Sequence, residues 1–326
     1  MEDFICNKIR PYPEFLTDFY YSLTALKKSP NTKQSYIEHV IEFLNFFAEI
    51  KNKDVYLICV DDLKDITTST IDRFIIKRRT LYGKEVKDQT MCVILSSLGS
   101  FFKFLYTHDL IDKDPFNGKI EKPHYEDDNP VVFMEMNEIE TVMENIKSGK
   151  IGGKYNRGTK DWIERDMLLF LIPIYTGIRV SALSNINIED MDLEHNCFIG
   201  TDKRNKTKTY YFDDKVKDLI EKYLVVRERK LEGIQPTDAF FISNKRGRMS
   251  PKSIRTLVHR YTFNIEKNIT PHKLRSTCAT TLYDKTCDIY LVADVLGHSS
   301  TNVTKRYTAI SDNRRAHAAQ VIGGLF

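Results

Sequence analysis

The chain carries the stretch Thr270-Pro271-His272-Lys273-Leu274-Arg275. Proline is well suited to the first turn of a helix, so the Thr-Pro pair predicts a helix that opens with His272. Arg275 follows three positions later. An arginine presents a planar fork of donors that can clamp two phosphate oxygens, which the point charge of a lysine does not do. The stretch therefore predicts a helix start that binds phosphate.

Three other short motifs supply further groups for phosphodiester chemistry. They are Thr176-Gly177-Ile178-Arg179, Leu296-Gly297-His298-Ser299 and Lys305-Arg306-Tyr307. Arg179 and Arg275 together can neutralise a pentavalent phosphorus centre, and histidine adds a donor to the same oxygens. Tyrosine is a nucleophile whose attack leaves a covalent phosphotyrosine. This set requires no metal ion and no nucleotide, so we expect the protein to use neither as a cofactor.

Each motif by itself has an ordinary structural explanation. A single His-x-x-Arg is usually a solvated helix edge, and Gly-His-Ser is usually a turn with a capping serine. One tyrosine in an arginine-rich stretch is usually an amphipathic surface residue. The combination of the four motifs is what is specific, because all four occur in this order within about 130 residues.

In order, spacing and flanking residues, the motifs closely resemble the tyrosine recombinase (phage integrase) family, and the resemblance covers nearly the whole chain. It implies a mainly α fold with a small β-hairpin or sheet in the C-terminal domain, in which a helical core-binding domain precedes a tyrosine-recombinase catalytic domain. The residues that would bind or protonate the scissile phosphate are Arg179, His272, Arg275 and His298. Tyr307, nine positions after His298, would attack it.

The family's remaining catalytic residue is a lysine on a β-hairpin. Strand-like segments at Cys197–Gly200 and Thr207–Phe212 predict such a hairpin here. By the resemblance, Lys203 occupies the position of the lysine thought to protonate the leaving 5′-hydroxyl. Lys206 and Lys208 lie on the same segment, and a run of lysines is also typical of a solvated or DNA-facing strand. Lys206 is the substitute if the register differs.

One position departs from the family's pattern. Three residues after its first arginine the family commonly has an acidic residue that supports the active site, and this chain has Ala182 there. The orientation of Arg179 would then be less well supported, or another carboxylate such as Glu189 or Asp190 would take over the role. No residue that touches the phosphate is lost.

The length of 326 residues and the hydrophobic content of 41% are enough for two cores. The segment from Lys122 to Pro130 is polar and proline-flanked, which is typical of a linker. We therefore expect a helical core-binding domain over residues 1–122, a linker over 123–130 and a catalytic domain over 131–326 with a C-terminal tail.

Apolar residues at three-to-four spacing predict four amphipathic helices in the first domain, which would form one small bundle. Their expected starts are near Phe15, after the capping cluster Ser29-Pro30-Asn31-Thr32, at Thr68, and at Asp88 or Thr90. In the second domain a helix is predicted near Met136. A longer apolar helix from Trp162 to Tyr175 would end at Gly177 and leave Arg179 at the start of the next helix.

The net charge is only +4, and the first 125 residues hold equal numbers of basic and acidic residues, so the surplus lies in the half that carries the motifs. Several basic clusters converging on one groove would hold duplex DNA in a salt-sensitive manner. The clusters are Lys77-Arg78-Arg79, Lys203 to Lys208, Lys245-Arg246-Gly247-Arg248, Lys252 with Arg255, and Arg314-Arg315.

The remaining composition indicates a cytoplasmic protein. The six cysteines are scattered without a Cys-x-x-Cys pair, so neither a zinc site nor a disulfide framework is indicated. No apolar run approaches the roughly 18 residues of a membrane helix, and residues 1–10 lack the apolar core of a signal peptide. We expect no membrane partner.

Three functions compete. The first is a site-specific recombinase (integrase, resolvase or Xer-like) that acts on paired inverted-repeat sites in double-stranded DNA. The others are a type IB topoisomerase and a non-catalytic DNA-binding protein on the same scaffold. The compact helical N-terminal domain favours the first over the second, and the complete set of catalytic residues disfavours the third.

Apolar residues follow the expected nucleophile near the C-terminus. They are Ala316, Ala319, Val321, Ile322, Leu325 and Phe326. These side chains either fold back on their own domain or, as the resemblance favours, form a helix that docks on a neighbour in a tetramer on DNA.

Overall fold

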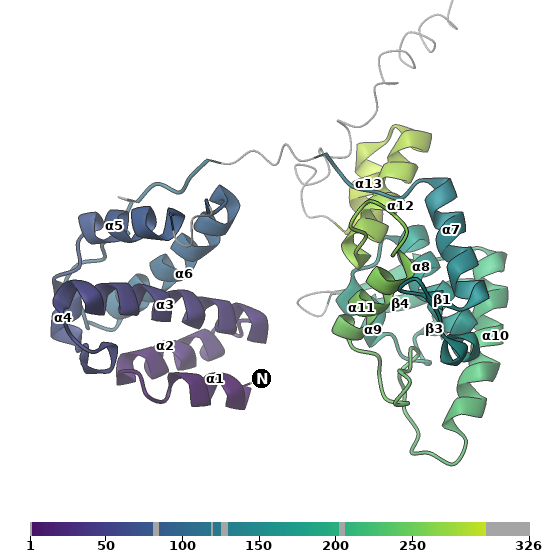
Figure 1. Cartoon of the computed structure of the whole chain (residues 1–326), viewed down its shortest axis with the longest axis horizontal. Helices are drawn as coiled ribbons and strands as arrows, with labels where there is room; N and C mark the ends of the chain where they lie inside the picture. Colours follow the sequence, from purple (N-terminus) through teal and green to yellow (C-terminus); the bar gives the residue numbers. More distant parts are fainter. Residues whose placement is uncertain (1, 81–84, 119, 125–129, 202–205, 298–326) are drawn as a thin grey trace, which may run out of the picture. The chain divides into compact units, whose positions relative to one another are not determined.

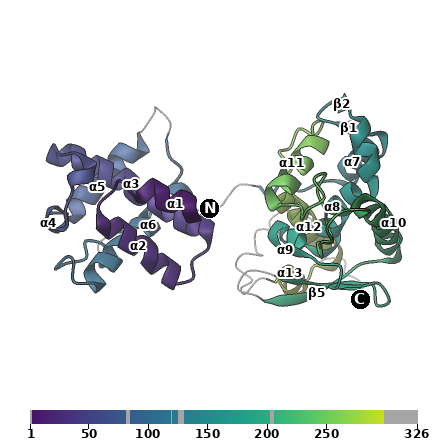
Figure 2. The same cartoon turned by 90° about the horizontal axis from the view of Figure 1, so that it is seen from below.

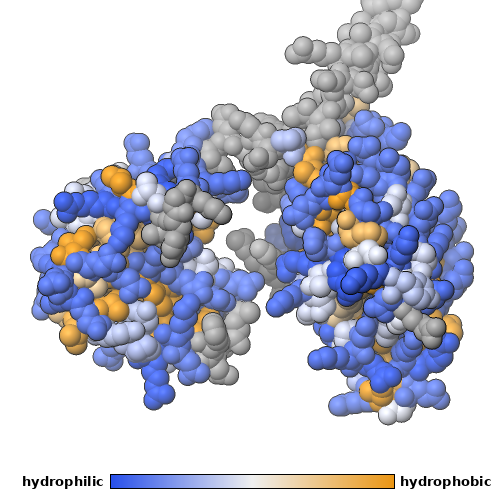
Figure 3. All heavy atoms as spheres, viewed as in Figure 1, coloured by the Kyte–Doolittle hydropathy of each residue, from blue (hydrophilic) through white to orange (hydrophobic). Residues whose placement is uncertain are grey.

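The computed structural model describes residues 2–80, 85–118, 120–124, 130–201 and 206–297 (Figure 1). The chain divides into two compact units, unit 1 over Met1–Asp128 and unit 2 over Asn129–Phe326. Helices dominate both units, and the strands are short and confined to unit 2 among the described residues, as the sequence predicts. The visible face of each unit is mainly hydrophilic (Figure 3).

Unit 1 is a small all-helical bundle. Its elements are α1 (Glu2–Ile9), α2 (Glu14–Ala25), α3 (Pro30–Lys51), the 3-10 turn η1 (Val55–Leu57), α4 (Val60–Lys64), α5 (Thr68–Arg79) and α6 (Asp88–Thr107). The four predicted helices are confirmed as α2, α3, α5 and α6. The predicted cap of α3 is also present, because the Ser29 side chain accepts a hydrogen bond from the Thr32 N–H and Pro30 opens the helix.

The core of unit 1 is built from aromatic rings of different helices. Phe43 on α3 packs edge-to-face against Phe74 on α5 and Phe102 on α6, with ring centroids 5.3 and 5.6 Å apart. All three side chains are buried. Such pairs add about 0.5–1.5 kcal/mol each to the stabilisation from apolar burial.

Helix α6 departs from one expectation. By length and composition alone, Asp88–Thr107 is apolar enough to cross a membrane, although no such run was expected. Half of that window is buried inside the protein, where it includes Leu98, Phe101 and Phe102. The apolar content of α6 is thus explained by its place in the core of unit 1.

Unit 2 arranges its helices around α8. Its elements are α7 (Met136–Ser148), β1 (Lys150–Ile151), β2 (Lys154–Tyr155), the 3-10 segment η3 (Arg157–Trp162), α8 (Ile163–Thr176), α9 (Val180–Asn185), β3 (Met191–Asp192), β4 (Cys197–Thr201), β5 (Thr207–Tyr211), α10 (Asp214–Leu231), α11 (Pro251–Tyr261), α12 (Pro271–Thr286) and α13 (Ile289–Leu296). Helix α8 contacts α7, α10, α11 and α12, and both views show it among them (Figure 1; Figure 2).

The predicted hairpin forms the main part of a sheet. Strands β3, β4 and β5 lie in that order and are antiparallel, with Phe198 on β4 opposite Tyr210 on β5. Strand β3 has only two residues, too few for an alternating pattern to reveal it in the sequence. The sheet contacts α8 and α9, so it lies beside the segment that contains Arg179.

Candidate active site

Helix α12 carries His272 and Arg275 one turn apart. The helix begins at Pro271 after the N-cap residue Thr270, as the sequence predicts. His272 is exposed, whereas Arg275 is only 3% exposed. A buried guanidinium requires hydrogen-bond acceptors, because an isolated buried charge is strongly unfavourable.

Two backbone carbonyl groups accept hydrogen bonds from Arg275. Its Nη1 donates to the oxygen of Gly177 and its Nη2 to the oxygen of Leu296, each across 2.5 Å. Gly177 is the C-cap of α8 and Leu296 is the last residue of α13. The carbonyl end of a helix carries partial negative charge, so both contacts are favourable for a cation. Arg275 thereby connects three of the four sequence motifs.

Gly177 permits this close approach of α8 and α13. Its φ of +63° lies in the left-handed region, and a Cβ added there would lie 2.7 Å from Leu296 Cδ2. The same Cβ would lie 3.4 Å from the Sγ of Cys278, one turn after Arg275. Burial raises the pKa of the Cys278 thiol to about 11, against the opposing effect of Arg275, so this cysteine stays protonated.

Arg179 lies at the start of α9, as predicted. It is the N-cap residue, with an extended backbone, and it is half-buried. Only one residue separates it from Gly177, so the contact between Arg275 and Gly177 brings the segments of both arginines together.

The other end of α9 is fixed by residues outside the four motifs. Arg248 Nη1 donates to the carbonyl oxygen of Ser184 across 3.0 Å and to that of Ile186 across 3.2 Å. The Ser184 hydroxyl donates to the Met249 carbonyl oxygen across 2.6 Å. These contacts hold the short helix that begins with Arg179. Sequence reasoning missed their role, since residues about 65 positions apart give no local signal.

Ala182 is buried on α9, in the position where the family commonly has an acidic residue. Of the two carboxylates considered as replacements, Glu189 is exposed. Asp190 accepts a hydrogen bond from the Asn187 N–H across 2.7 Å, which stabilises its own turn. The identity of a carboxylate that supports Arg179 therefore stays a prediction.

The hairpin formed by β4 and β5 contacts α13. On β5, Lys208 Nζ donates to the carbonyl oxygens of Asp294 and Val295, in the last turn of α13. Lys206 is exposed. The predicted proton donor Lys203 lies outside the described residues, between the two strands that the structure does describe. The hairpin and the segment preceding His298 are therefore linked through Lys208.

Tyr210 lies beside the candidate site, and the sequence motifs gave no indication of it. It is 5% exposed, and its ring stacks on Phe198 with centroids 5.2 Å apart. Burial raises the pKa of Tyr210, while the charges of Arg275 and Arg179 act to lower it. The phenol is thus within electrostatic reach of both arginines. Only the strand register, which places Tyr210 opposite Phe198, could have indicated this.

Two more of the predicted catalytic residues, His298 and Tyr307, also lie outside the described residues, as does the apolar tail from Ala316 to Phe326. The described part of the chain therefore brings together Arg179, Arg275 and the start of α12, and ends at Gly297. The roles of all six residues stay predictions.

The basic clusters differ in their surroundings. In unit 1, Lys77, Arg78 and Arg79 each form an ion pair with a carboxylate, namely Glu49, Glu42 and Asp88. In unit 2, Lys245, Lys252 and Arg260 line one hollow of about 540 Å³. Arg255 and His259 are exposed on the same helix as Lys252. The surface of α11 is thus the better candidate for contact with a polyanion.

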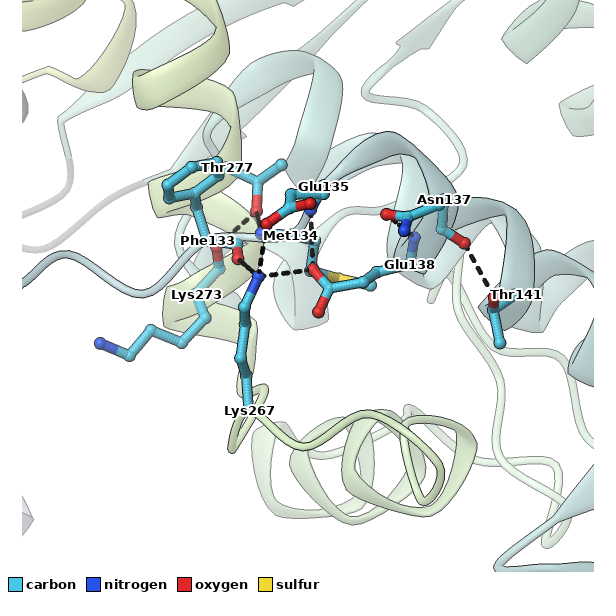
Figure 4. A network of polar contacts seen from close by, with 9 residues as sticks. All are labelled: Phe133, Met134, Glu135, Asn137, Glu138, Thr141, Lys267, Lys273 and Thr277. Atoms are coloured by element: carbon cyan, nitrogen blue, oxygen red, sulfur yellow. Dashed lines mark hydrogen bonds and ion pairs between the residues drawn. The ribbon is translucent and has the colours of Figure 1, made fainter. Parts of the chain in front are cut away.

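The segment that enters unit 2 is joined to α12. The Met134 N–H donates to the Thr277 hydroxyl across 2.9 Å, and Thr277 lies on α12 (Figure 4). Lys267, just before α12, contacts the carboxylates of Glu135 and Glu138 at 3.2 and 2.9 Å. Desolvation lowers the pKa of Lys267, but these two carboxylates raise it overall, which keeps the ammonium charged.

Among the described residues, no group of three or more histidine, cysteine, aspartate or glutamate side chains could hold a metal ion. The six cysteines all lie in the described ranges and are free thiols.

Comparison with known proteins gives a consistent result. The model of the phage integrase family matches residues 133–314. The chain is 28% identical to tyrosine recombinase XerS of Lactococcus lactis subsp. cremoris (strain MG1363), with 94% of each protein covered. It is 29% identical to tyrosine recombinase XerC of Caldanaerobacter subterraneus subsp. tengcongensis (strain DSM 15242 / JCM 11007 / NBRC 100824 / MB4), over 94% of this chain and 86% of that protein.

Solved structures show the same fold. One is the XerH site-specific recombinase bound to a palindromic difH substrate in a post-cleavage complex, with a TM-score of 0.67, 22% identity, and 89% of this chain and 80% of that chain covered. Another is a lambda integrase dimer bound to a COC′ core site, with a TM-score of 0.62, 16% identity, and coverage of 90% and 94%. The predicted fold class is confirmed.

Proposed function

The chain belongs to the phage integrase family, and from this premise we propose that it is a site-specific DNA recombinase that cleaves and rejoins DNA through a 3′-phosphotyrosine intermediate. The observation that carries the proposal is the position of Arg275, whose guanidinium contacts Gly177 and Leu296. One cationic side chain thereby joins two segments of the chain. The first contains Arg179, and the second immediately precedes His298. Curated relatives matched over nearly their full length are named tyrosine recombinases.

The proposed reaction uses this chain's own side chains. Tyr307 gives its phenolic proton to water and attacks the phosphorus, which forms the phosphotyrosine bond. The bond to the 5′-oxygen breaks, and Lys203 gives that oxygen a proton. Arg179 and Arg275 stabilise the charge on the non-bridging oxygens. His272 and His298 add donors to the same oxygens. Pre-placed donors of this kind contribute about 3 kcal/mol each to transition-state stabilisation.

The covalent intermediate explains how strands are rejoined without ATP. The phosphotyrosine retains the energy of the broken phosphodiester bond, so a 5′-hydroxyl from another duplex reverses the first step. A type IB topoisomerase would use the same chemistry without exchange. The named relatives are recombinases, which disfavours this alternative. All six predicted catalytic residues are present in the sequence, which disfavours a DNA-binding protein without activity.

We further propose that the partner is double-stranded DNA with paired inverted-repeat sites. Exchange between two duplexes that are each cut at two positions requires four protomers. The apolar tail from Ala316 to Phe326 would then dock on a neighbouring protomer, with apolar burial worth roughly 1.5–3 kcal/mol per large side chain. We also propose a cytoplasmic location, where chromosomal or mobile-element DNA would be the substrate.

A trapping experiment tests the proposed function. The recombination site is first obtained by selecting bound sequences from a random duplex pool, and is then placed in a nicked suicide duplex. We expect an adduct at the 3′-phosphate that withstands SDS, that forms in EDTA, and that is absent in Tyr307→Phe. Tyr290→Phe is the matched control, because Tyr290 is 75% exposed on α13.

Each proposed feature has its own contradicting result. An undiminished adduct in Tyr307→Phe would exclude this residue as the nucleophile. Loss of cleavage in EDTA with recovery on adding Mg²⁺ would exclude the metal-free mechanism. Relaxation of supercoiled DNA without exchange between paired sites would favour the topoisomerase alternative.

A further inference from the structure

Tyr210 is buried at the edge of the candidate active site. Its ring is stacked on Phe198 of the neighbouring strand at an interplanar angle of 20°, and the residue is 5% exposed. The two residues are directly opposite in the register of β4 and β5. A cross-strand aromatic pair in this register fixes the direction of both rings.

The ring of Tyr210 extends across Gly200 toward the segment that contains Arg179. A Cβ added to Gly200 would lie 2.7 Å from Tyr210 Cε2 and 3.2 Å from Ile178 Cδ1. The Cε atoms adjoin the carbon that bears the hydroxyl group. The hydroxyl end of the ring therefore lies near Ile178, the residue immediately before Arg179, and Gly200 provides the space for it.

The Tyr210 hydroxyl has no hydrogen-bond acceptor among the described residues around it. It makes no hydrogen bond to any residue in the described ranges. The charged groups that affect it, Arg275 and Arg179, are guanidinium groups, which donate hydrogen bonds but cannot accept them. The phenolic proton is therefore available to an acceptor other than these groups. An anion placed between the two arginines would provide one.

We propose that the Tyr210 hydroxyl donates a hydrogen bond to a non-bridging oxygen of the DNA phosphate bound by Arg179 and Arg275. The inference rests on the proposed function, because it assigns a further substrate-contacting residue to that same site. Tyr210 keeps its proton throughout, so it stabilises the transition state and forms no covalent bond. It acts as one neutral donor beside two charged ones.

The first test removes only the hydroxyl group. Tyr210→Phe retains the ring that stacks on Phe198, and Tyr211→Phe is its control, since Tyr211 on the same strand is 70% exposed on the opposite face. We expect single-turnover adduct formation on the suicide duplex to be about tenfold slower in Tyr210→Phe, the effect of one lost hydrogen bond. Tyr211→Phe should react as the wild type does. Thermal midpoint and affinity for a single site should be unchanged in both.

A second measurement separates contact with the phosphate from a purely structural role. The scissile phosphate is replaced by each of its two phosphorothioate diastereomers, in which sulfur, a weak acceptor, replaces one non-bridging oxygen. The ratio of wild-type to Tyr210→Phe rates should fall to about one on one diastereomer. It should remain about tenfold on the other.

The outcomes distinguish this inference from the proposed function. If the wild-type protein forms no adduct, the proposed function fails. If the wild type cleaves normally and Tyr210→Phe is equally fast, or if its defect is the same on all three substrates, the inference about Tyr210 is wrong while the proposed function stands. Adduct formation at Tyr210 itself in Tyr307→Phe would also overturn the donor role.

Discussion

The Nη1 atom of Arg275 lies 2.5 Å from the carbonyl oxygen of Gly177, which is two positions before Arg179. The two proposed phosphate-binding arginines thus differ in their surroundings. Arg275 is buried and supports the junction of α8, α12 and α13, whereas Arg179 is half-buried at the start of a short helix. Substitutions of the two should therefore differ in their effect on stability, although both should impair cleavage.

The matched substitutions Arg275→Lys and Arg179→Lys test this difference. A lysine cannot reach two carbonyl oxygens with a planar fork, so Arg275→Lys should lower the free energy of unfolding by about 2–4 kcal/mol. Arg179→Lys should change it by less than about 1 kcal/mol. Both should slow cleavage by about 10²–10³-fold. Fluorescence of the single tryptophan, Trp162, reports unfolding of unit 2. Equal loss of stability in both variants would contradict the assignment.

The lysine assignment is tested through the leaving group. A 5′-bridging sulfur in place of the oxygen leaves readily as a thiolate and needs no proton donor. Lys203→Ala should therefore cleave the natural substrate at least about 100-fold more slowly than the wild type, and the sulfur-containing substrate at nearly the wild-type rate. Lys206→Ala is the matched control. If Lys206→Ala shows this rescue and Lys203→Ala does not, Lys206 is the proton donor.

Gly177→Ala tests the close approach of α8 and α13. The new Cβ would lie 2.7 Å from Leu296 Cδ2 and would require a φ of +63°. We expect a loss of about 2–4 kcal/mol in the free energy of unfolding, together with slower cleavage. Gly233→Ala is the control, because its φ is +72° but no atom lies within 4 Å of its Cβ. It should lose only about 1 kcal/mol. Equal effects would show that backbone strain, and not the contact, is responsible.

The ionised side chain of Asp62 should stabilise unit 1, and this stabilisation should be lost in acid. A hydrogen bond from the Cys59 N–H and the Lys53 ammonium hold the pKa of Asp62 at about 2, below its usual 3.8. The folded-state pKa is lowered, so the stabilisation is fully present above pH 3.8 and is lost as the pH falls toward 2. Asp62→Asn should therefore destabilise unit 1 by about 1–2 kcal/mol at pH 6, and this difference from the wild type should shrink below pH 4.

Hydrogen exchange at α4 amides, combined with urea denaturation, measures this effect. Asp61→Asn is the control, because the Asp61 side chain is 84% exposed in its pair with Lys64. It should have little effect at any pH. A difference between Asp62→Asn and the wild type that stays constant from pH 6 to pH 3 would contradict the role of the Asp62 charge.

Local sequence signals predicted the helices well, because caps, prolines and apolar spacing act within a few residues. Ser29-Pro30 and Thr270-Pro271 begin α3 and α12, and Gly177 ends α8. The sequence did not reveal α1 and α4, of eight and five residues, because such short segments show too little periodicity.

The sequence predicts which residue types the candidate site would use, but it does not predict the contacts between them. Motif order predicts Arg179 and Arg275 as phosphate ligands, yet the buried position of Arg275 involves a carbonyl group 98 positions away in the chain. The position of Tyr210 depends on the register of two strands and on the absence of a Cβ at Gly200. Neither is determined by local spacing, because both result from tertiary packing.

The attachment of Met134 to Thr277 has a mechanical consequence. The chain entering unit 2 is hydrogen-bonded to α12 before the first helix of that unit, α7, begins. Lys267 adds ion pairs at the same place. Tension applied along the polypeptide at this entrance is therefore transmitted directly to the helix that carries His272 and Arg275, before it reaches the rest of the unit.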